Sequence, residues 1–425
     1  MLIGEKIFIS NGKLKGNVSP PPSKSISHRA ILCAAMANGV SVLDNIVLSK
    51  DVSLTMDAVR ALGASVAVEG DRIIVDGRGM FDEGDVLIDC HESGSTLRFL
   101  VPIALATYRR VRFVGSAHLG TRRLDPFFSI FQQDGISYTK NPSLQMDFEI
   151  EGSLKGGVYR IDGNVSSQFI TGLLYVLPIM NVDSKIIVEN GLQSRGYIDL
   201  TIDVLQTFGI EIQNNGYEEF IIKGNQKYIP QDYTVENDFS QAAFFLCADA
   251  LGNDIRVDGM NMDSLQGDKQ VIDCLVKLGC RVILDEGSIK VVPENLTGAV
   301  IDGSDIPDII PILSVVCALA KGSSRLINIE RLRIKECDRL SAMSDLLTRL
   351  GVEVEELENE LVIHGTDHFT GGELSSYNDH RIAMSMAIAS TRGTEPFVID
   401  NPGCVNKSYI HFWDDFRKLG GKVDE

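Results

Sequence analysis

The chain has 425 residues, of which 44% are hydrophobic and 7% aromatic, and its formal net charge at pH 7 is −18. A chain of this length is too long for a single hydrophobic core, so two domains are expected. The negative charge argues against a general nucleic-acid or membrane-surface binder, because both kinds of partner attract basic faces. Any anionic ligand must therefore be held by a local cluster of cations.

The cysteines and the apolar stretches indicate the cellular compartment of the protein. The eight cysteines are scattered without a CxxC pair, and Cys33, Cys247 and Cys317 fall within apolar helical segments. This usage is typical of small core residues in a reducing compartment. The N-terminal segment does not look like a signal peptide, and the longest apolar stretch, residues 170–180, is too short to cross a membrane. We expect a soluble, cytoplasmic protein.

A repeated unit runs along the chain. In the first copy, residues 40–77, a short strand and a polar loop precede a helix with Met56, Val59 and Leu62 at helical spacing, and alternation over 65–75 then predicts a hairpin. Each helix ends in a glycine suited to a left-handed C-cap. These glycines recur about every 70 residues, which indicates a sixfold structural repeat; they are Gly63, Gly135, Gly209, Gly279, Gly351 and Gly420.

A second, very apolar helix follows in each copy. The six segments are residues 26–39, 95–108, 167–180, 240–252, 309–322 and 380–393. They are apolar almost all round, which predicts helices buried between sheets.

The last copy suggests how the chain divides. It lacks a closing strand, whereas residues 5–12, EKIFISNG, resemble the closing strands of the first and fifth copies. Copies 4 to 6 with this strand would form one lobe, 1–18 plus 238–425, and copies 1 to 3 the other, 22–236. The chain would cross between lobes at 19–22 and 230–238. Two nearby linkers are typical of a hinge, and we expect the site in a cleft between the lobes.

Polar residues distinguish the starts of the apolar helices. The first begins PPSKSISHR, which places Lys24, Ser25 and Arg29 at a helix N-terminus, where free N–H groups and cations favour an anion. Gly94 would let a ligand approach the backbone closely. The equivalent starts are ESGST at 92–96, SSQ at 166–168, IPD at 306–308 and NDHR at 378–381.

The loops before the amphipathic helices carry a second set of charges. They read GTRRLD at 120–125, QSRGYID at 193–199, RIKECDRL at 333–340 and CVNKS at 404–408. If equivalent ends meet, the cations converge on a ligand with several negative charges; they are Lys24, Arg29, Arg122, Lys335, Arg339, Arg381 and Lys407.

Each of these residues has a simpler interpretation. A single Lys or Arg near a helix start is usually a solvated surface group, Asp308 could cap the next helix, and Glu336 could belong to a surface ion pair. His364 and His368 are separated by Gly365, which indicates a turn rather than a pair of metal ligands, so we assign no metal.

Taken together, the motifs resemble those of the 3-phosphoshikimate 1-carboxyvinyltransferase (EPSP synthase) family. The matching segments run in order along the whole chain: PSKSISHRA, ESGSTLRF, GTRRLDP, SSQ, SRGYID, IPD, KECDRL, NDHR and NKS. The resemblance implies an α/β fold of two lobes, each built from three βαβαββ repeats as an inside-out α/β barrel. It also implies transfer of the enolpyruvyl group of phosphoenolpyruvate to the 5-hydroxyl of shikimate 3-phosphate, with release of phosphate, on the route to chorismate and the aromatic amino acids.

The resemblance also implies residue roles. Shikimate 3-phosphate would be held by Ser25, Arg29, Ser166, Ser167, Ser194, Tyr197 and Asp308, with Lys335 reaching it from the other lobe. Phosphoenolpyruvate would be held by Gly94, Arg122, Arg339, Arg381 and Lys407, with His380 as a further candidate contact. Lys24 and Gln168 would touch both substrates. Asp308 would take the hydroxyl proton, Glu336 would transfer a proton at the methylene carbon, and Lys24 would assist catalysis. The resemblance implies no cofactor and a monomer.

Two positions depart from the family pattern. Glu92 stands where the family often has Asn, and Arg123 stands where an Arg-Pro pair is usual, so Arg123 could offset the charge of Glu92. Gly94 is retained, which implies room for the inhibitor glyphosate.

Two other functions remain as alternatives. The related enolpyruvyl transferase that acts on UDP-N-acetylglucosamine carries a cysteine where this chain has Ala117, while the KECDR and SSQ motifs favour shikimate 3-phosphate. A non-catalytic, clamp-like repeat protein would carry its basic residues along exposed helix faces, whereas here they lie at helix starts.

Overall fold

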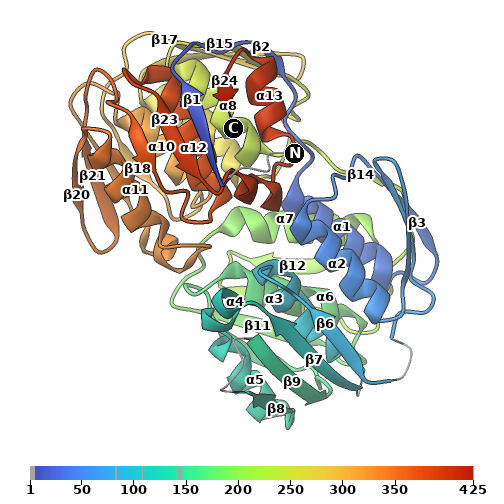
Figure 1. Cartoon of the computed structure of the whole chain (residues 1–425). Coiled ribbons are helices and arrows are strands. Elements are labelled where there is room, and N and C mark those ends of the chain that lie inside the picture. Colours follow the sequence, from blue (N-terminus) through green and yellow to red (C-terminus); the bar gives the residue numbers. More distant parts are fainter. Residues whose placement is uncertain (1–4, 82–83, 108, 142–145, 425) are drawn as a thin grey trace. The chain divides into compact units, whose positions relative to one another are not determined.

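The computed structural model describes residues 5–81, 84–107, 109–141 and 146–424 (Figure 1). The chain divides into two compact units, of which unit 2 is the continuous segment Pro22–Glu236. Unit 1 combines Met1–Pro21 with Asn237–Glu425. Each unit encloses its own hydrophobic core. Among the described residues, no helix is both long and apolar enough to pass through a membrane.

Unit 2 contains three successive copies of the repeat. The first has α1 (Lys24–Met36), β3 (Val40–Asp44), α2 (Lys50–Ala61), β4 (Ser65–Glu69) and β5 (Arg72–Asp76). The second has β6 (Val86–Asp89), α3 (Gly94–Ala104), β7 (Arg109–Gly115), α4 (Ala117–Thr121), α5 (Asp125–Asp134), β8 (Ser137–Lys140) and β9 (Met146–Gly152). The third has β10 (Val158–Asp162), α6 (Ser167–Val176), η1 (Leu177–Ile179), β11 (Ser184–Glu189), α7 (Arg195–Thr207), β12 (Ile212–Asn215) and β13 (Glu219–Ile222), and β14 (Tyr233–Thr234) follows.

Unit 1 begins with β1 (Lys6–Ser10) and β2 (Lys15–Val18) and holds the other three copies. The fourth has α8 (Phe239–Ala250), β15 (Asp254–Val257), η2 (Gly267–Gln270), α9 (Val271–Lys277), β16 (Cys280–Asp285) and β17 (Ser288–Pro293). The fifth has β18 (Val300–Asp302), α10 (Ile310–Cys317), β19 (Ser323–Ile327), η3 (Glu330–Ile334), α11 (Arg339–Arg349), β20 (Glu353–Glu356) and β21 (Glu360–His364). The sixth has β22 (Gly372–Leu374), α12 (His380–Ala389), η4 (Ser390–Arg392), β23 (Phe397–Asp400), η5 (Pro402–Lys407), α13 (Phe412–Lys418) and β24 (Lys422–Asp424).

The strands of the described residues form six four-stranded sheets that share one topology. In β6-β7-β9-β8, for example, β6 and β7 are parallel and the other neighbours are antiparallel. The parallel pair is joined through a buried helix, as a parallel connection requires. The other sheets are β10-β11-β13-β12, β14-β3-β5-β4, β16-β17-β15-β2, β18-β19-β21-β20 and β22-β23-β1-β24.

Three sheets are completed by strands from distant parts of the sequence. Strand β1 lies between β23 and β24 and is antiparallel to both. Strand β2 adds in parallel to β15, and β14 adds in parallel to β3. The sequence pattern did not predict β2 or β14, because one is short and mostly polar and the other has only two residues. The two chain crossings lie side by side, since Ser23 N donates to Glu236 O at 2.8 Å and Asp238 N donates to Pro21 O at 2.9 Å.

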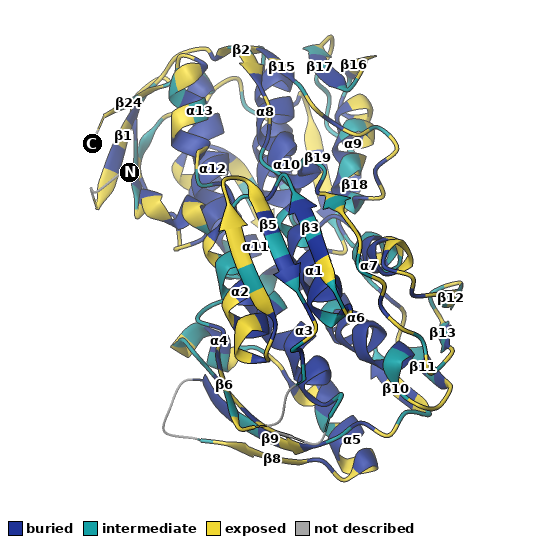
Figure 2. Cartoon of the chain, turned by 90° about the vertical axis from the view of Figure 1, so that its right-hand side faces the viewer, coloured by how far each residue is buried: buried dark blue, intermediate teal, exposed yellow. Residues whose placement is uncertain are grey.

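The apolar helices occupy the interior of each unit, as predicted. All twelve residues of α8 are buried, and α8 packs against α10 and α12 within unit 1. In unit 2, α3 packs against α6. Figure 2 shows these helices as buried, whereas along β3 and β5 buried residues alternate with intermediate or exposed ones. The predicted C-cap glycines are also confirmed, because all six have positive φ angles, from 74° at Gly135 to 108° at Gly63.

Candidate active site

Arg339 lies at the centre of a buried charge cluster in unit 1. It is the first residue of α11, and its side chain is only 1% exposed. Its Nη1 donates to Asp308 Oδ1 at 2.9 Å, and its Nη2 donates to Glu336 Oε2 at 2.6 Å. Its Nε donates to Asp379 Oδ2 at 2.7 Å. Three carboxylates thus fix one guanidinium.

Asp308 joins this cluster to two further cations. Lys335 Nζ donates to Asp308 Oδ1 at 3.3 Å, and Arg381 Nη2 donates to Asp308 Oδ2 at 3.1 Å. The N-cap residue of α10 is Ile309, one position after Asp308. The Glu336 pair is not a surface ion pair, since its partner Arg339 is buried.

Asp379 and Ser240 are residues of this cluster to which the sequence analysis gave no role. Asp379 is fully buried, and its carboxylate accepts from Arg381 N at 2.8 Å, which caps α12. Ser240 Oγ accepts from Arg381 Nη2 at 3.0 Å and donates to Asp238 Oδ1 at 2.6 Å. Asp379 is the N-cap of α12 in the NDHR motif, so a search for N-caps would have found it, whereas Ser240 lies two residues after Asp238, the N-cap of α8.

Burial and the neighbouring opposite charges shift the pKa values of the groups in this cluster in opposite directions. Burial alone would raise the pKa of Asp379, but Arg339 and His380 together hold that pKa below its usual value. Burial lowers the pKa of Lys335, and Asp308 opposes that shift. His380 is buried with its Nδ1 3.7 Å from Asp379 Oδ1. Lys407 Nζ donates to the carbonyl of Asn378 at 2.6 Å, so it lies next to the start of α12.

The start of α1 carries Lys24 and Arg29, two of the predicted cations of unit 2. Ser23 caps this helix by accepting from Ile26 N, and Lys24 Nζ donates to Asp51 Oδ2 at 3.0 Å. Arg29 is 3% exposed, and its Nη1 donates to Ser25 O at 2.8 Å. A guanidinium has five N–H donors, so Arg29 can order the backbone and also reach a ligand.

A chain of buried hydroxyl groups holds the starts of α1, α2 and α3 together. His28 Nδ1 lies 2.7 Å from Thr55 Oγ1, which is 2.8 Å from Thr96 Oγ1. Thr96 Oγ1 is in turn 2.7 Å from Ser93 Oγ, the N-cap of α3. All four side chains are buried. These hydrogen bonds therefore fix the starts of α1 and α3, two predicted anion-binding helix ends, relative to each other.

Gly94 and Arg122 are brought into direct contact. A Cβ atom on Gly94 would stand 2.5 Å from Arg122 Nη1, so the guanidinium rests against the first residue of α3. Arg123 donates to both oxygens of Asp125, at 2.9 and 2.6 Å. The expectation that Arg123 offsets Glu92 is not supported by these bonds, because Arg123 pairs with its near neighbour instead.

The start of α6 presents Ser166, Ser167 and Gln168. Ser166 caps the helix by accepting from Gln168 N at 3.3 Å. The Gln168 amide is held at both atoms, because Arg98 Nη1 donates to its Oε1 at 2.8 Å and its Nε2 donates to Ser95 Oγ at 2.9 Å. Arg98 and Ser95 belong to the ESGSTLRF motif but were given no role from the sequence.

Ser194 and Tyr197 lie at the start of α7, beside α1. Ser194 is buried in a left-handed conformation with φ 58°. The carbonyl of Tyr197 accepts from Arg29 Nη2 at 2.9 Å, and Arg29 Nε donates to Thr201 Oγ1 at 2.9 Å. Unit 2 therefore places Tyr197 next to Arg29, and Ser194 lies at the same end of α7, where its carbonyl accepts from Tyr197 N at 3.1 Å.

The structure offers no candidate metal centre within the described ranges, where no group of three or more His, Cys, Asp or Glu residues could hold an ion. His364 Nδ1 lies 2.8 Å from Ser323 Oγ, and its Nε2 lies 3.0 Å from Glu355 Oε1.

Comparison with known proteins identifies the family. The family model described as EPSP synthase (3-phosphoshikimate 1-carboxyvinyltransferase) matches residues 9–416. The chain belongs to the EPSP synthase family. The 3-phosphoshikimate 1-carboxyvinyltransferase of Clostridium perfringens strain ATCC 13124 is 50% identical over 419 residues, which is 98% of this chain and 99% of the relative. That of Clostridioides difficile strain 630 is 47% identical over 433 residues, or 99% of this chain and 98% of the relative.

Solved structures of EPSP synthase and a related enzyme share the fold. An EPSP synthase from Acinetobacter baumannii has a TM-score of 0.81 and 24% identity, covering 99% of this chain and 100% of that one. The enolpyruvyl transferase NikO from Streptomyces tendae has a TM-score of 0.82 and 17% identity, covering 99% and 98%. The predicted family and the predicted two-lobe fold class are confirmed.

Proposed function

We propose that this chain transfers the enolpyruvyl group of phosphoenolpyruvate to the 5-hydroxyl of shikimate 3-phosphate, with release of phosphate. It is a transferase of the EPSP synthase family. Within the structure, the observation that carries the proposal is the cluster of Lys335, Arg339 and Arg381 around Asp308. Substrates that are both phosphate esters and carboxylates require such concentrated cations in a protein of charge −18.

Phosphoenolpyruvate is assigned to the guanidinium groups. Arg339 and Arg381 present planar donors that suit a carboxylate or a phosphate, and their anchoring by Asp379 and Ser240 supports this role. The remaining contacts assigned to this substrate are Lys24, Gly94, Arg122, Gln168 and Lys407, with His380 as a further candidate.

Shikimate 3-phosphate is assigned mainly to helix starts of unit 2. The hydroxyl groups and the backbone N–H groups at the starts of α1, α6 and α7 suit a phosphate and a polyol. The residues assigned are Lys24, Ser25, Arg29, Ser166, Ser167, Gln168, Ser194 and Tyr197 from unit 2, with Asp308 and Lys335 from unit 1.

The proton transfers are assigned to Asp308 and Glu336. Asp308 accepts the proton of the 5-hydroxyl, and Glu336 acts at the methylene carbon, whose protonation makes the adjacent carbon electrophilic. The hydroxyl oxygen adds to that carbon; phosphate then leaves while the new methyl loses a proton. Both carboxylates share Arg339 as a donor, at 2.9 and 2.6 Å. An anionic substrate that competes for this donor raises the proton affinity of both groups at the moment the reaction needs it.

We also propose that the protein is a cytoplasmic monomer that uses its two chain crossings, 19–22 and 230–238, as a hinge. The lobes proposed are residues 1–18 plus 238–425 and residues 22–236. All eight cysteines are free thiols and all but Cys337 are buried, which supports a reducing compartment.

The test measures release of inorganic phosphate from phosphoenolpyruvate with either shikimate 3-phosphate or UDP-N-acetylglucosamine as acceptor. Release is expected only with shikimate 3-phosphate, and Lys24→Met should abolish it. The matched control is Lys223→Met, because Lys223 pairs with Asp183 on the surface and its side chain is 76% exposed. Activity only with the UDP-sugar, or a fully active Lys24→Met, would reject the proposal.

A further inference from the structure

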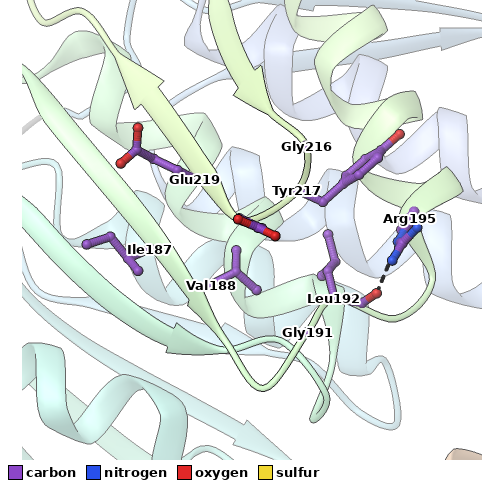
Figure 3. Close-up of a pocket in the computed structure, with 9 residues that line it drawn as sticks. Ile187, Val188, Gly191, Leu192, Arg195, Gly216, Tyr217 and Glu219 are labelled. Carbon is purple, nitrogen blue, oxygen red and sulfur yellow. Dashed lines mark hydrogen bonds between the residues drawn. The ribbon is translucent and has the colours of Figure 1, made fainter.

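The loop that joins β11 to α7 has little packing on one side. Figure 3 shows the cavity of about 490 Å³ on that side, between the loop and the hairpin tip that joins β12 to β13. Gly191, Leu192 and Arg195 line it from the loop and helix, and Gly216 and Tyr217 line it from the hairpin. Because the cavity removes contacts on that side, directional interactions across it help to hold the loop in position.

Tyr217 supplies those interactions. Its hydroxyl group lies 2.8 and 3.0 Å from the two carboxylate oxygens of Asp199, to which it donates. The guanidinium carbon of Arg195 lies 5.4 Å from the centre of the Tyr217 ring, and its Nε donates to Leu192 O at 3.4 Å. Arg195 and Asp199 are four residues apart on α7 and thus share one helix face. The Tyr217 side chain therefore contacts two residues in the first two turns of α7 and links them to the hairpin.

The hairpin that carries Tyr217 is itself well fixed. Tyr217 has a left-handed backbone with φ 61°, and its N–H donates to Asn214 Oδ1 at 2.8 Å. The carbonyl of Glu218 accepts from Val188 N, at the end of β11, at 2.9 Å. The hairpin tip is thus hydrogen-bonded to the sheet. Through Tyr217, the position of the hairpin determines the position of α7.

The opposite face of α7 carries the residues assigned to substrate. Tyr197 and Thr201 contact Arg29 of α1 through the hydrogen bonds described above. Ser194 precedes the helix as its N-cap, in a left-handed conformation with φ 58°. A shift of α7 away from the hairpin would move Ser194 and Tyr197 together.

We propose that Tyr217 is a positioning residue for shikimate 3-phosphate, acting through Asp199 and Arg195 on Ser194 and Tyr197. The inference rests on the proposed function. Tyr217 does not touch substrate; it sets the distance between the start of α7 and the start of α1. Loss of its hydroxyl group weakens binding of the acceptor while leaving the residues assigned to phosphoenolpyruvate unchanged.

The test compares steady-state kinetics of wild type, Tyr217→Phe, Asp199→Asn and the double variant. The expected result is a rise of about five- to tenfold in the KM for shikimate 3-phosphate in each, with less than about a twofold change in kcat and in the KM for phosphoenolpyruvate. The double variant should be no worse than Tyr217→Phe, because Tyr217→Phe already removes the donor, whereas Asp199→Asn keeps a neutral acceptor and weakens the same bond. Asp199→Asn tests the bond independently if Tyr217→Phe folds poorly.

Tyr138→Phe is the matched control, since it removes a phenol hydroxyl from the same unit at a side chain that is 42% exposed. It should behave as wild type. Equal kinetics for Tyr217→Phe and Tyr138→Phe, or equal increases in both KM values, would overturn the inference while the proposed function stands. A wild type that does not turn over the two substrates would reject the proposed function and this inference with it.

Discussion

Arg339 and Asp379 form a buried, two-point ion pair, in which Nε donates to Oδ2 at 2.7 Å and Nη2 donates to Oδ1 at 3.3 Å. Asp379 also accepts from the backbone N–H of Arg381. One carboxylate therefore fixes the first residue of α11 and the start of α12. The Arg339 guanidinium thus obtains its orientation, and Arg381 the position of its backbone, from a residue that was given no role from the sequence.

We predict that Asp379→Asn reduces both stability and activity. The amide keeps the size but leaves the buried Arg339 with less compensating charge, which costs about 3 kcal/mol of unfolding free energy. Urea unfolding should show this loss, and the KM for phosphoenolpyruvate should rise at least tenfold. The surface pair of Asp57 and Arg60 provides the control, because Asp57→Asn should cost about 0.5 kcal/mol or less. Equal effects of the two substitutions would contradict the prediction.

His28 should make unit 2 sensitive to acid. Burial, assisted by the charges of Lys24 and Arg29 and opposed by Asp51, lowers the pKa of His28 from 6.5 to about 3. The unfolded chain therefore binds the extra proton at a higher pH than the folded chain does. Stability is complete above pH 6.5 and is lost as the pH falls below it, by about 2 kcal/mol at pH 5.

The check compares urea unfolding of wild type and His28→Asn at pH 7 and pH 5. Wild type should lose about 2 kcal/mol more than the variant over that interval. His411→Asn is the control, because the His411 side chain is 66% exposed, and it should follow wild type. Parallel losses in wild type and His28→Asn would show that His28 does not carry the effect.

Gly94→Ala should weaken phosphoenolpyruvate binding. The added methyl group would stand 2.5 Å from Arg122 Nη1 and must displace that guanidinium. We expect the KM for phosphoenolpyruvate to rise about tenfold and the KM for shikimate 3-phosphate to change less than about twofold. Glyphosate should inhibit wild type and should inhibit this variant less. Unimpaired wild-type turnover at high glyphosate concentration would disprove the second part.

The repeat glycine Gly279 and a second left-handed glycine, Gly252 after α8, should differ in their tolerance of alanine. Gly279 has φ 92°, and a Cβ there would lie 2.1 Å from Asn295 O, whereas Gly252 has φ 86° with no atom within 4 Å of such a Cβ. Gly252→Ala should therefore cost about 1 to 2 kcal/mol for the left-handed backbone alone. Gly279→Ala should cost clearly more, because the backbone must also move. Thermal unfolding midpoints test the order, and a larger loss at Gly252 would refute it.

Much of the fold follows from patterns that repeat along the sequence. The left-handed glycines, the apolar helices and the helix–hairpin order could be predicted, because each is a local preference expressed in several copies. Strands β2 and β14 could not, because neither has a periodic pattern and each is defined only by the distant strand with which it pairs.

The candidate site also has a part that the sequence predicts and a part that it does not. Lys24, Arg339 and Arg381 could be proposed from charges at equivalent helix ends. The contacts of Asp379 with Arg339, of Ser240 with Arg381 and of Arg98 with Gln168 join residues 40 to 141 positions apart. Such contacts arise from the packing of one copy against another, so no local pattern contains them.

The place of β1 between β23 and β24 also sets the order in which the two units can be completed during synthesis. Unit 2 is one continuous stretch and can fold as soon as Glu236 has left the ribosome. Unit 1 needs its first strand and its last, so β1 must wait for almost the whole chain before its sheet can close. The residues of β1 are thus made before unit 2 but can be folded only after β23 and β24 have been made, and until then they need protection from pairing with other chains.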